Sequence, residues 1–267
     1  MQKGIHHIQI QRQKSNTLSS QEDIVAVEEP LEIQVQEFDA KSAQSISVTM
    51  RTPGNDEALA LGFLFTEGLL KNYNQVKAVF PFGENKVVVQ LQEGVTIELN
   101  KTERNFYTTS SCGVCGKSSI EAIKTNSQFK ISTPVKPSKE LLFGLQETLS
   151  NQQSLFSLTG GIHAAALFDF TGKLLLIQED VGRHNALDKL IGEAMKNGKL
   201  PLNKHILLLS GRASFELIQK AVMAGISTIV AVGAPSSLAV ELAKEHNQTL
   251  IGFLKKDGFN VYAGEIA

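Results

Sequence analysis

The sequence has no excess of charge of one sign, no long apolar run and no apolar leader at its start. Its formal net charge is −1 at pH 7, which argues against a large nucleic-acid-binding surface. The most apolar stretch, residues 221–234, is broken by glycine, serine and threonine and is too short to cross a bilayer. The opening MQKGIHH lacks the apolar segment of a secretory signal. We therefore expect a cytoplasmic protein with neither a membrane segment nor a nucleic-acid partner.

Cysteine is also scarce. The chain has two cysteines, Cys112 and Cys115, and they stand together as a C-x-x-C pair flanked by glycine and hydroxyl residues. The surrounding segment has no apolar periodicity, which predicts an exposed, mobile loop. Without an export signal, such a pair indicates a reactive or metal-binding site rather than a structural disulfide. Lys117 and the helix-like run that it begins favour the reactive thiolate.

The remaining composition is that of an ordinary globular protein, with 42% hydrophobic residues. The start of the chain is rich in Gln, Ser and Lys, whereas the region beyond residue 205 alternates short apolar runs with helical ones. Such alternation is typical of a parallel sheet covered by helices. Four parts are predicted: a flexible tail at residues 1–22, an α+β subdomain at 23–103, a mobile cysteine loop at 104–117 and an α/β domain at 118–267.

Apolar periodicity and turn residues also predict individual elements. In the first subdomain we expect strands at 31–35 and 46–50, a helix at 56–66 capped by Asn55, and a hairpin that joins 87–91 to 95–99 through Glu93-Gly94. In the second we expect a helix at 139–149, a hairpin at 167–177, a helix after residue 185, strands at 205–209, 228–232 and 249–254, and helices at 215–224 and 238–246.

Three loops of the α/β domain are expected at one edge of its sheet, beyond the carboxyl ends of the strands, where such folds bind ligands. These loops are residues 210–214, 233–237 and 254–258. Ser210, Arg212, two lysines and free backbone N–H groups would suit a ligand that carries phosphates. The alternative is that Ser214 and Ser236 only cap helices and that the lysines lie in a solvated turn.

The densest polar cluster is EDVGRHN at residues 179–185, between an expected strand and an expected helix. Arg183 and His184 are candidate ligand contacts there, because they lie near a helix N-terminus. The alternative is that Asn185 caps the helix, that the two leading acidic residues pair with Arg183, and that His184 lies on the surface.

His163 is a further candidate, because the two glycines before it permit close approach of a ligand. A lone histidine in such a place is more often a partly buried structural residue. Two other patterns are weak. Residues 115–118 end like a phosphate-binding P-loop, but Ser111 replaces the first glycine and no apolar strand precedes it. Zinc would require two histidines besides the cysteines, and the deaminase zinc signature is absent. We expect no metal site.

Taken together, several motifs resemble the formate dehydrogenase accessory proteins of the FdhD type, from about residue 25 to the end of the chain. The motifs are ALGFLFTEG at 60–68, CGVCG at 112–116, TGGIHAAA at 159–166, EDVGRHNALDK at 179–189 and SGRASFE at 210–216. The resemblance implies a cytidine-deaminase-like three-layer α/β domain with an N-terminal α+β subdomain, and a homodimer.

The same resemblance implies a sulfur carrier, similar to a sulfurtransferase. Such a protein accepts a persulfide sulfur from a cysteine desulfurase and passes it to the molybdenum (or tungsten) bis(molybdopterin guanine dinucleotide) cofactor. The cofactor then enters formate dehydrogenase. A GDP or GMP moiety is the part expected to bind to the α/β domain.

By position, Cys112 matches the persulfide-bearing cysteine, and Cys115 is an auxiliary thiol or dispensable. The segment that matches the cofactor contacts consists of Phe253, Leu254, Lys255, Lys256, Asp257 and Gly258. The chain departs from the family pattern at Leu254, where a small residue or cysteine is common, and at residues 257–259, where a Pro-Gly-Arg-like ending is common.

Two other functions stay open from the sequence. One is a dithiol oxidoreductase that cycles Cys112 and Cys115, although the polar stretch before the pair is unlike the apolar strand that precedes a thioredoxin-type motif. The other is a non-catalytic chaperone for formate dehydrogenase maturation, in which the cysteines are incidental.

Overall fold

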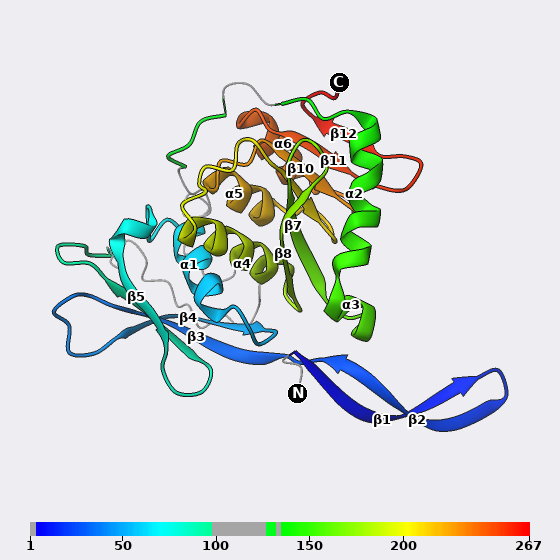
Figure 1. Cartoon of the computed structure of the whole chain (residues 1–267), viewed down its shortest axis with the longest axis horizontal. Helices are drawn as coiled ribbons and strands as arrows, with labels where there is room; N and C mark the ends of the chain where they lie inside the picture. Colours follow the sequence, from blue (N-terminus) through cyan, green and yellow to red (C-terminus); the bar gives the residue numbers. More distant parts are fainter. Residues whose placement is uncertain (1–3, 98–126, 132–134) are drawn as a thin grey trace.

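The computed structural model describes residues 4–97, 127–131 and 135–267, and these form a mixed α/β protein (Figure 1). The largest sheet of the described part has the strand order β12-β11-β10-β9-β7-β8. Its strands are β7 (His163–Phe168), β8 (Leu174–Asp180), β9 (Ile206–Leu209), β10 (Thr228–Ala231), β11 (Thr249–Gly252) and β12 (Asn260–Ala263). Strands β9, β10 and β11 are parallel, while β7, β8 and β12 are antiparallel to their neighbours. The predicted parallel core and the 167–177 hairpin are confirmed.

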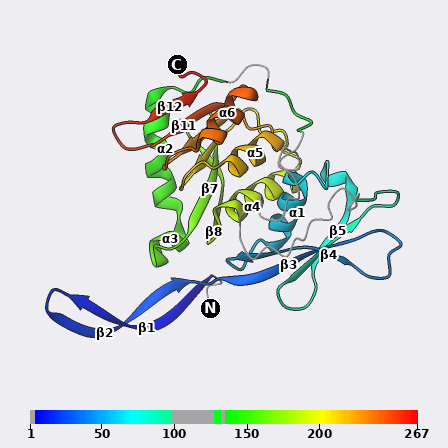
Figure 2. The ribbon, with the colours of Figure 1, turned by 180° about the vertical axis from the view of Figure 1, so that it is seen from behind.

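Helices cover both faces of this sheet (Figures 1 and 2). One face carries α4 (Arg183–Lys196), α5 (Phe215–Met223) and α6 (Ser237–Glu245), and the other carries α2 (Lys139–Gln152) and α3 (Ser154–Thr159). Successive strand residues serve the two faces in turn, as the pleat requires. Leu207 and Ile229 pack toward α4–α6, whereas Leu208 and Val230 pack toward Leu145 of α2. The three-layer α/β arrangement and the predicted helices are therefore confirmed.

The N-terminal subdomain contains a four-stranded sheet of order β4-β3-β6-β5. Its elements are β3 (Glu29–Gln36), β4 (Gln44–Arg51), α1 (Asp56–Thr66), a 3-10 turn η1 (Tyr73–Gln75), β5 (Val76–Pro81) and β6 (Lys86–Leu91). The strands predicted at 31–35 and 46–50 and the helix at 56–66 are confirmed. The hairpin predicted through Glu93-Gly94 is wrong, because β6 is already paired with β3 on one side and β5 on the other. Residues 95–97 therefore cannot pair with β6, and they lie outside the strands.

The flexible tail predicted for residues 1–22 is wrong over its described part. Residues 5–26 form a two-stranded ribbon of β1 (Ile5–Lys14) and β2 (Thr17–Ala26), paired in continuous register around a turn at Ser15 and Asn16. Ser15 has a φ of 48°, as the tight turns of hairpins require. The ribbon projects from the body (Figure 1). A polar composition does not prevent pairing, because the backbone groups of each strand satisfy those of the other.

The two predicted parts of the chain share one hydrophobic core. Helix α1 lies between the N-terminal sheet and α4, and its backbone touches that of α4. A Cβ atom on Gly62 would lie 1.9 Å from the carbonyl oxygen of Asp188, and one on Gly192 would lie 1.9 Å from that of Ala58. Only glycine permits so close a crossing. The cysteine loop at 104–117 lies outside the described residues.

Candidate functional site

The candidate ligand residues of the α/β domain do meet at one edge of the large sheet. The parallel strands β9, β10 and β11 end there, and antiparallel pairing brings the start of β7 and the end of β8 to the same edge. His163 lies opposite Asp180, and Ala165 lies opposite Leu209. The edge therefore gathers the loops after β9, β10 and β11 together with the first turn of α4.

The loops at this edge are bonded to one another. The N–H of Gly233 donates to Gly211 O (2.9 Å), that of Ala213 to Ala234 O (3.2 Å) and that of Phe253 to Gly233 O (3.1 Å). The prediction of free backbone N–H groups is wrong for Gly233 and Ala213, which lie in the predicted loops. Their amides hold the loops in a fixed arrangement instead.

The serines of these loops differ in role. Ser236 caps α6 by accepting a hydrogen bond from Ala239 N (3.3 Å), so the alternative interpretation holds for it. Ser210 accepts a hydrogen bond from Ala164 N (2.8 Å) and joins β7 to the loop after β9. Ser214 stands at the N-cap position of α5 without a side-chain cap, and its hydroxyl lies 3.3 Å from Nε2 of His184.

The acidic residues of the EDVGRHN cluster are bound away from Arg183. Glu179 accepts hydrogen bonds from the N–H groups of Leu155 (3.0 Å) and Phe156 (2.9 Å) in the first turn of α3. Asp180 is fully buried and lies 2.7 Å from Nζ of Lys189. The interpretation that these two acids pair with Arg183 is therefore wrong. It failed because their partners come from segments that local sequence does not reveal.

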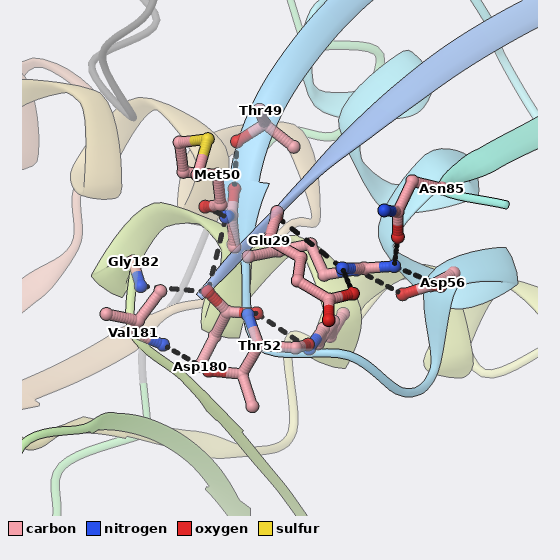
Figure 3. Close-up of polar contacts among 12 residues, drawn as sticks. Glu29, Thr49, Met50, Thr52, Asp56, Asn85, Asp180, Val181 and Gly182 are labelled. Atoms are coloured by element: carbon pink, nitrogen blue, oxygen red, sulfur yellow. Dashed lines mark hydrogen bonds and ion pairs between the residues drawn. The ribbon is translucent and has the colours of Figure 1, made fainter. Parts of the chain in front are cut away.

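Asp180 is the centre of a buried network that joins α4 to the N-terminal sheet (Figure 3). It accepts hydrogen bonds from the N–H groups of Thr52 (3.2 Å) and Gly182 (2.8 Å). Asn185 donates to Met50 O (2.7 Å) rather than capping the helix, and the N-cap position belongs to Gly182. The predicted cap at Asn185 is wrong. Likewise Asn55 occupies the N-cap position of α1 without a side-chain cap bond.

A second buried network was missed by the sequence interpretation. Nζ of Lys220 donates to Oδ2 of Asp188 (2.9 Å) and to Oγ1 of Thr66 (2.8 Å), and it lies 3.6 Å from Glu67. Burial alone would lower the Lys220 pKa, but the Asp188 and Glu67 carboxylates hold it above its ordinary value. The available signal was a charged residue at an apolar position of a helical repeat, which indicates a buried partner.

Once these pairs are assigned, a group of cationic and imidazole side chains is left at the edge. Arg183 is half-buried, and its Nε has no hydrogen-bond partner among the described residues. Arg212 is exposed, and no ion pair joins it to a described carboxylate. His163 lies against Gly211, where a Cβ atom would be 3.2 Å from its Nδ1. Burial, together with the charges of Arg183 and His184, lowers the His163 pKa below its ordinary value. Such a group suits an anionic ligand.

Only some side chains of the segment after β11, residues 253–258, are exposed and available to a ligand. Phe253 has a φ of 54° and leaves 41% of its surface exposed. Leu254 is fully buried and packs in the core beneath α2, so its side chain is not available to a ligand. Lys255, Lys256 and Asp257 are exposed, and a turn is closed by the hydrogen bond from Lys255 N to Gly258 O (2.8 Å).

Cys112 and Cys115 lie outside the described residues.

A cavity of about 680 Å³ lies between the base of the ribbon, the start of α1 and the end of α4, and none of the predicted site residues lines it. Its three cations are already paired: Arg51 with Asp56, Lys86 with Glu32 and Lys196 with Glu57, each at 3.0 Å. The sheet edge, where Arg183 and Arg212 have no ion pair with a described carboxylate, is therefore the stronger candidate site. No helix in the described part of the chain is both long and apolar enough to span a membrane.

The fold and the edge define an α/β protein with a candidate anion-binding site beyond its parallel strands. Residues 26–266 match the model of the FdhD/NarQ family. The chain is 48% identical over 265 residues to the sulfur carrier protein FdhD of Streptomyces avermitilis, covering 95% of this chain and 92% of that protein. It is 41% identical over 258 residues to that of Sulfolobus acidocaldarius, covering 97% and 96%. The chain therefore belongs to the FdhD/NarQ family.

A solved structure supports the same fold. A candidate formate dehydrogenase accessory protein from Desulfotalea psychrophila matches with a TM-score of 0.73 at 20% identity, covering 98% of this chain and 97% of that one. At this level of identity the likeness concerns the fold.

Proposed function

We propose that this protein is a sulfur carrier that delivers sulfur to the molybdenum bis(molybdopterin guanine dinucleotide) cofactor of formate dehydrogenase. The names of the relatives support the first part, and the name of the structural neighbour supports the link to formate dehydrogenase. The observation that carries the cofactor assignment is the group of cationic side chains at the sheet edge that have no ion pair with a described residue, Arg183 and Arg212 above all. A cofactor with several phosphates is the kind of anion that such side chains bind.

The chemistry assigned to Cys112 is nucleophilic. Its thiolate attacks the terminal sulfur of a persulfide on a cysteine desulfurase, the donor S–S bond breaks, and the donor leaves as a thiolate. The new persulfide on Cys112 carries the same oxidation level, so no external oxidant is required. Release of that sulfur as sulfide requires two electrons. Cys115 supplies them by attacking Cys112 and forming a disulfide, which a cellular thiol then reduces.

The partners of this proposal are a cysteine desulfurase, formate dehydrogenase and a second copy of the chain in a homodimer, all in the cytoplasm. The likeness of the three-layer domain to the cytidine deaminases belongs to the proposal as well. It concerns the fold and not the deaminase chemistry.

The proposal is tested by intact-mass measurement after incubation with a cysteine desulfurase and cysteine. The wild type should gain the mass of one sulfur atom on Cys112, and Cys112→Ala should gain none there and should not support formate dehydrogenase maturation. Cys115→Ala is the matched control and should still acquire sulfur. Maturation supported by Cys112→Ala, or absence of a persulfide on the wild type, would contradict the proposal and favour the chaperone alternative. A reversible disulfide with reductase turnover but no persulfide would favour the oxidoreductase.

A further inference from the structure

Arg183 has no counter-ion within the described protein. It begins α4 at the sheet edge, its Nε is buried without a hydrogen-bond partner, and no ion pair joins it to a described carboxylate. The nearest acids in sequence are committed elsewhere: Glu179 to the first turn of α3 and Asp180 to Lys189. A half-buried guanidinium without a partner is costly. An external anion would remove that cost.

Two imidazoles face the same place. His163 enters from the start of β7 and lies close enough to Arg183 and His184 for their charges to lower its pKa, after the larger effect of burial. His184 is only 4% exposed, and its Nδ1 has no partner among the described residues. Its Nε2 lies 3.3 Å from the Ser214 hydroxyl and 3.7 Å from Oε2 of Glu216. Three nitrogen-bearing side chains from two elements therefore lie at this edge, and two of them hold a buried nitrogen without a hydrogen-bond partner among the described residues.

The backbone adds to this set. Helix α4 has 14 residues, and its N-cap is Gly182, which has no side chain to satisfy the first N–H groups of the helix. The positive end of the helix dipole lies at the same place and favours an anion. Asp180 does not compete for this position, because its oxygens accept from Gly182 N and Thr52 N and bind Lys189.

We propose that Arg183, His163 and His184 form a phosphate subsite at the first turn of α4, which takes a phosphate or diphosphate group of the ligand. The guanidinium supplies a two-pronged donor, and the imidazoles and the helix N-terminus supply further N–H groups. The inference rests on the proposed function, since the nucleotide cofactor is the phosphate-bearing ligand assigned to this edge.

This subsite is separate from the segment at residues 253–258. His163 of the subsite lies on β7, and β7 and β11 are separated by β9 and β10; three strand spacings of about 4.8 Å amount to roughly 14 Å. The segment at residues 253–258 follows β11 and therefore lies farther along the same edge.

The test is calorimetric titration of the full chain with inorganic pyrophosphate at fixed ionic strength. Arg183→Gln should weaken binding about tenfold or more, because a hydrogen-bonded charge is lost, and Arg183→Lys should restore part of it. Arg12→Gln is the matched control, since it removes the same charge from the exposed ribbon, and it should bind like the wild type. GDP should displace pyrophosphate, whereas guanosine should not. Circular dichroism should show each variant folded.

The outcomes separate this inference from the proposed function. Absence of pyrophosphate binding by the wild type, equal binding by Arg183→Gln, or displacement by guanosine as effective as that by GDP would each overturn the subsite. If Arg183-dependent binding is observed but Cys112 acquires no sulfur, the subsite stands and the sulfur-carrier proposal fails. If Cys112 acquires sulfur but pyrophosphate does not bind, only the subsite fails.

Discussion

At the scale of single residues, two glycines decide how the two parts of the chain fit together. Gly62 of α1 and Gly192 of α4 lie where the helix backbones touch, and a Cβ atom on either would overlap a carbonyl oxygen of the other helix at 1.9 Å. Glycine inside a helix costs about 1 kcal/mol relative to alanine. Glycine is nevertheless required at both positions, because a larger residue would prevent the close crossing of α1 and α4.

Gly192→Ala should therefore lower the free energy of unfolding by about 1–3 kcal/mol, because a backbone neighbour cannot move aside. The control is Gly144→Ala in α2, where a Cβ atom would meet nothing within 4 Å. That change should raise stability by up to about 1 kcal/mol. Urea unfolding followed by circular dichroism measures both, and equal stability of the two variants would contradict the account of the crossing.

At the scale of elements, the EDVGRHNALDK segment does two kinds of work. Asp180, Asn185 and Lys189 face the N-terminal sheet and fix α4 to the end of β4, as Figure 3 shows for Asp180. His184 contacts Ser214 in the loop after β9, and Arg183 begins the helix at the same edge. One short segment therefore attaches the two parts of the fold and places the candidate ligand contacts.

Asp180→Asn should lower the free energy of unfolding by about 3–5 kcal/mol, because it leaves the Lys189 ammonium buried without its counter-charge. The double variant Asp180→Asn with Lys189→Met should recover part of the loss. Lys196→Met is the control: its pair with Glu57 is 3.0 Å long but about half exposed, and its loss should cost no more than about 1 kcal/mol. Equal losses for the buried and the exposed pair, measured by denaturant titration, would argue against the network.

Element prediction succeeded where periodicity and burial agree. The strands β9, β10 and β11 are short apolar runs between amphipathic helices, so both their type and their parallel order followed from the pattern. The ribbon was missed because it has few apolar residues and little core to bury. The hairpin at Glu93-Gly94 was misplaced because the pairing of β6 depends on β3, more than 50 residues earlier.

At the scale of the whole molecule, the ribbon is a projection on an otherwise layered body (Figures 1 and 2). It contacts the body at its base, where α3 lies beside β2 and Gly4 lies near Leu155. Few buried side chains tie its outer half to the core, so that half contributes little to global stability.

A shortened ribbon tests this description. Residues 9–22 can be replaced by Asn-Gly, so that Ile8 and Asp23, which already face each other, flank a two-residue turn. The free energy of unfolding should stay within about 1 kcal/mol of the wild type, because the removed residues are mostly exposed. A much larger loss in thermal or urea unfolding would show that the ribbon packs on the body more than the structure indicates.

The sequence alone was enough to determine the alternation of β9, α5, β10, α6 and β11 and the edge at which Ser210, Arg212 and the loop after β11 meet; the antiparallel pairing that brings His163 and the start of α4 to the same edge came from the structure. This follows because strand and helix periods are local, and parallel strands must present their carboxyl ends on one side. The tertiary structure decided which polar side chains remain available to a ligand. Asp180 is bound by Thr52, 128 positions away, and no local pattern encodes so distant a partner. Arg183 is left without an ion pair in the described part of the chain, and that became visible only when Glu179 and Asp180 had been assigned to other partners.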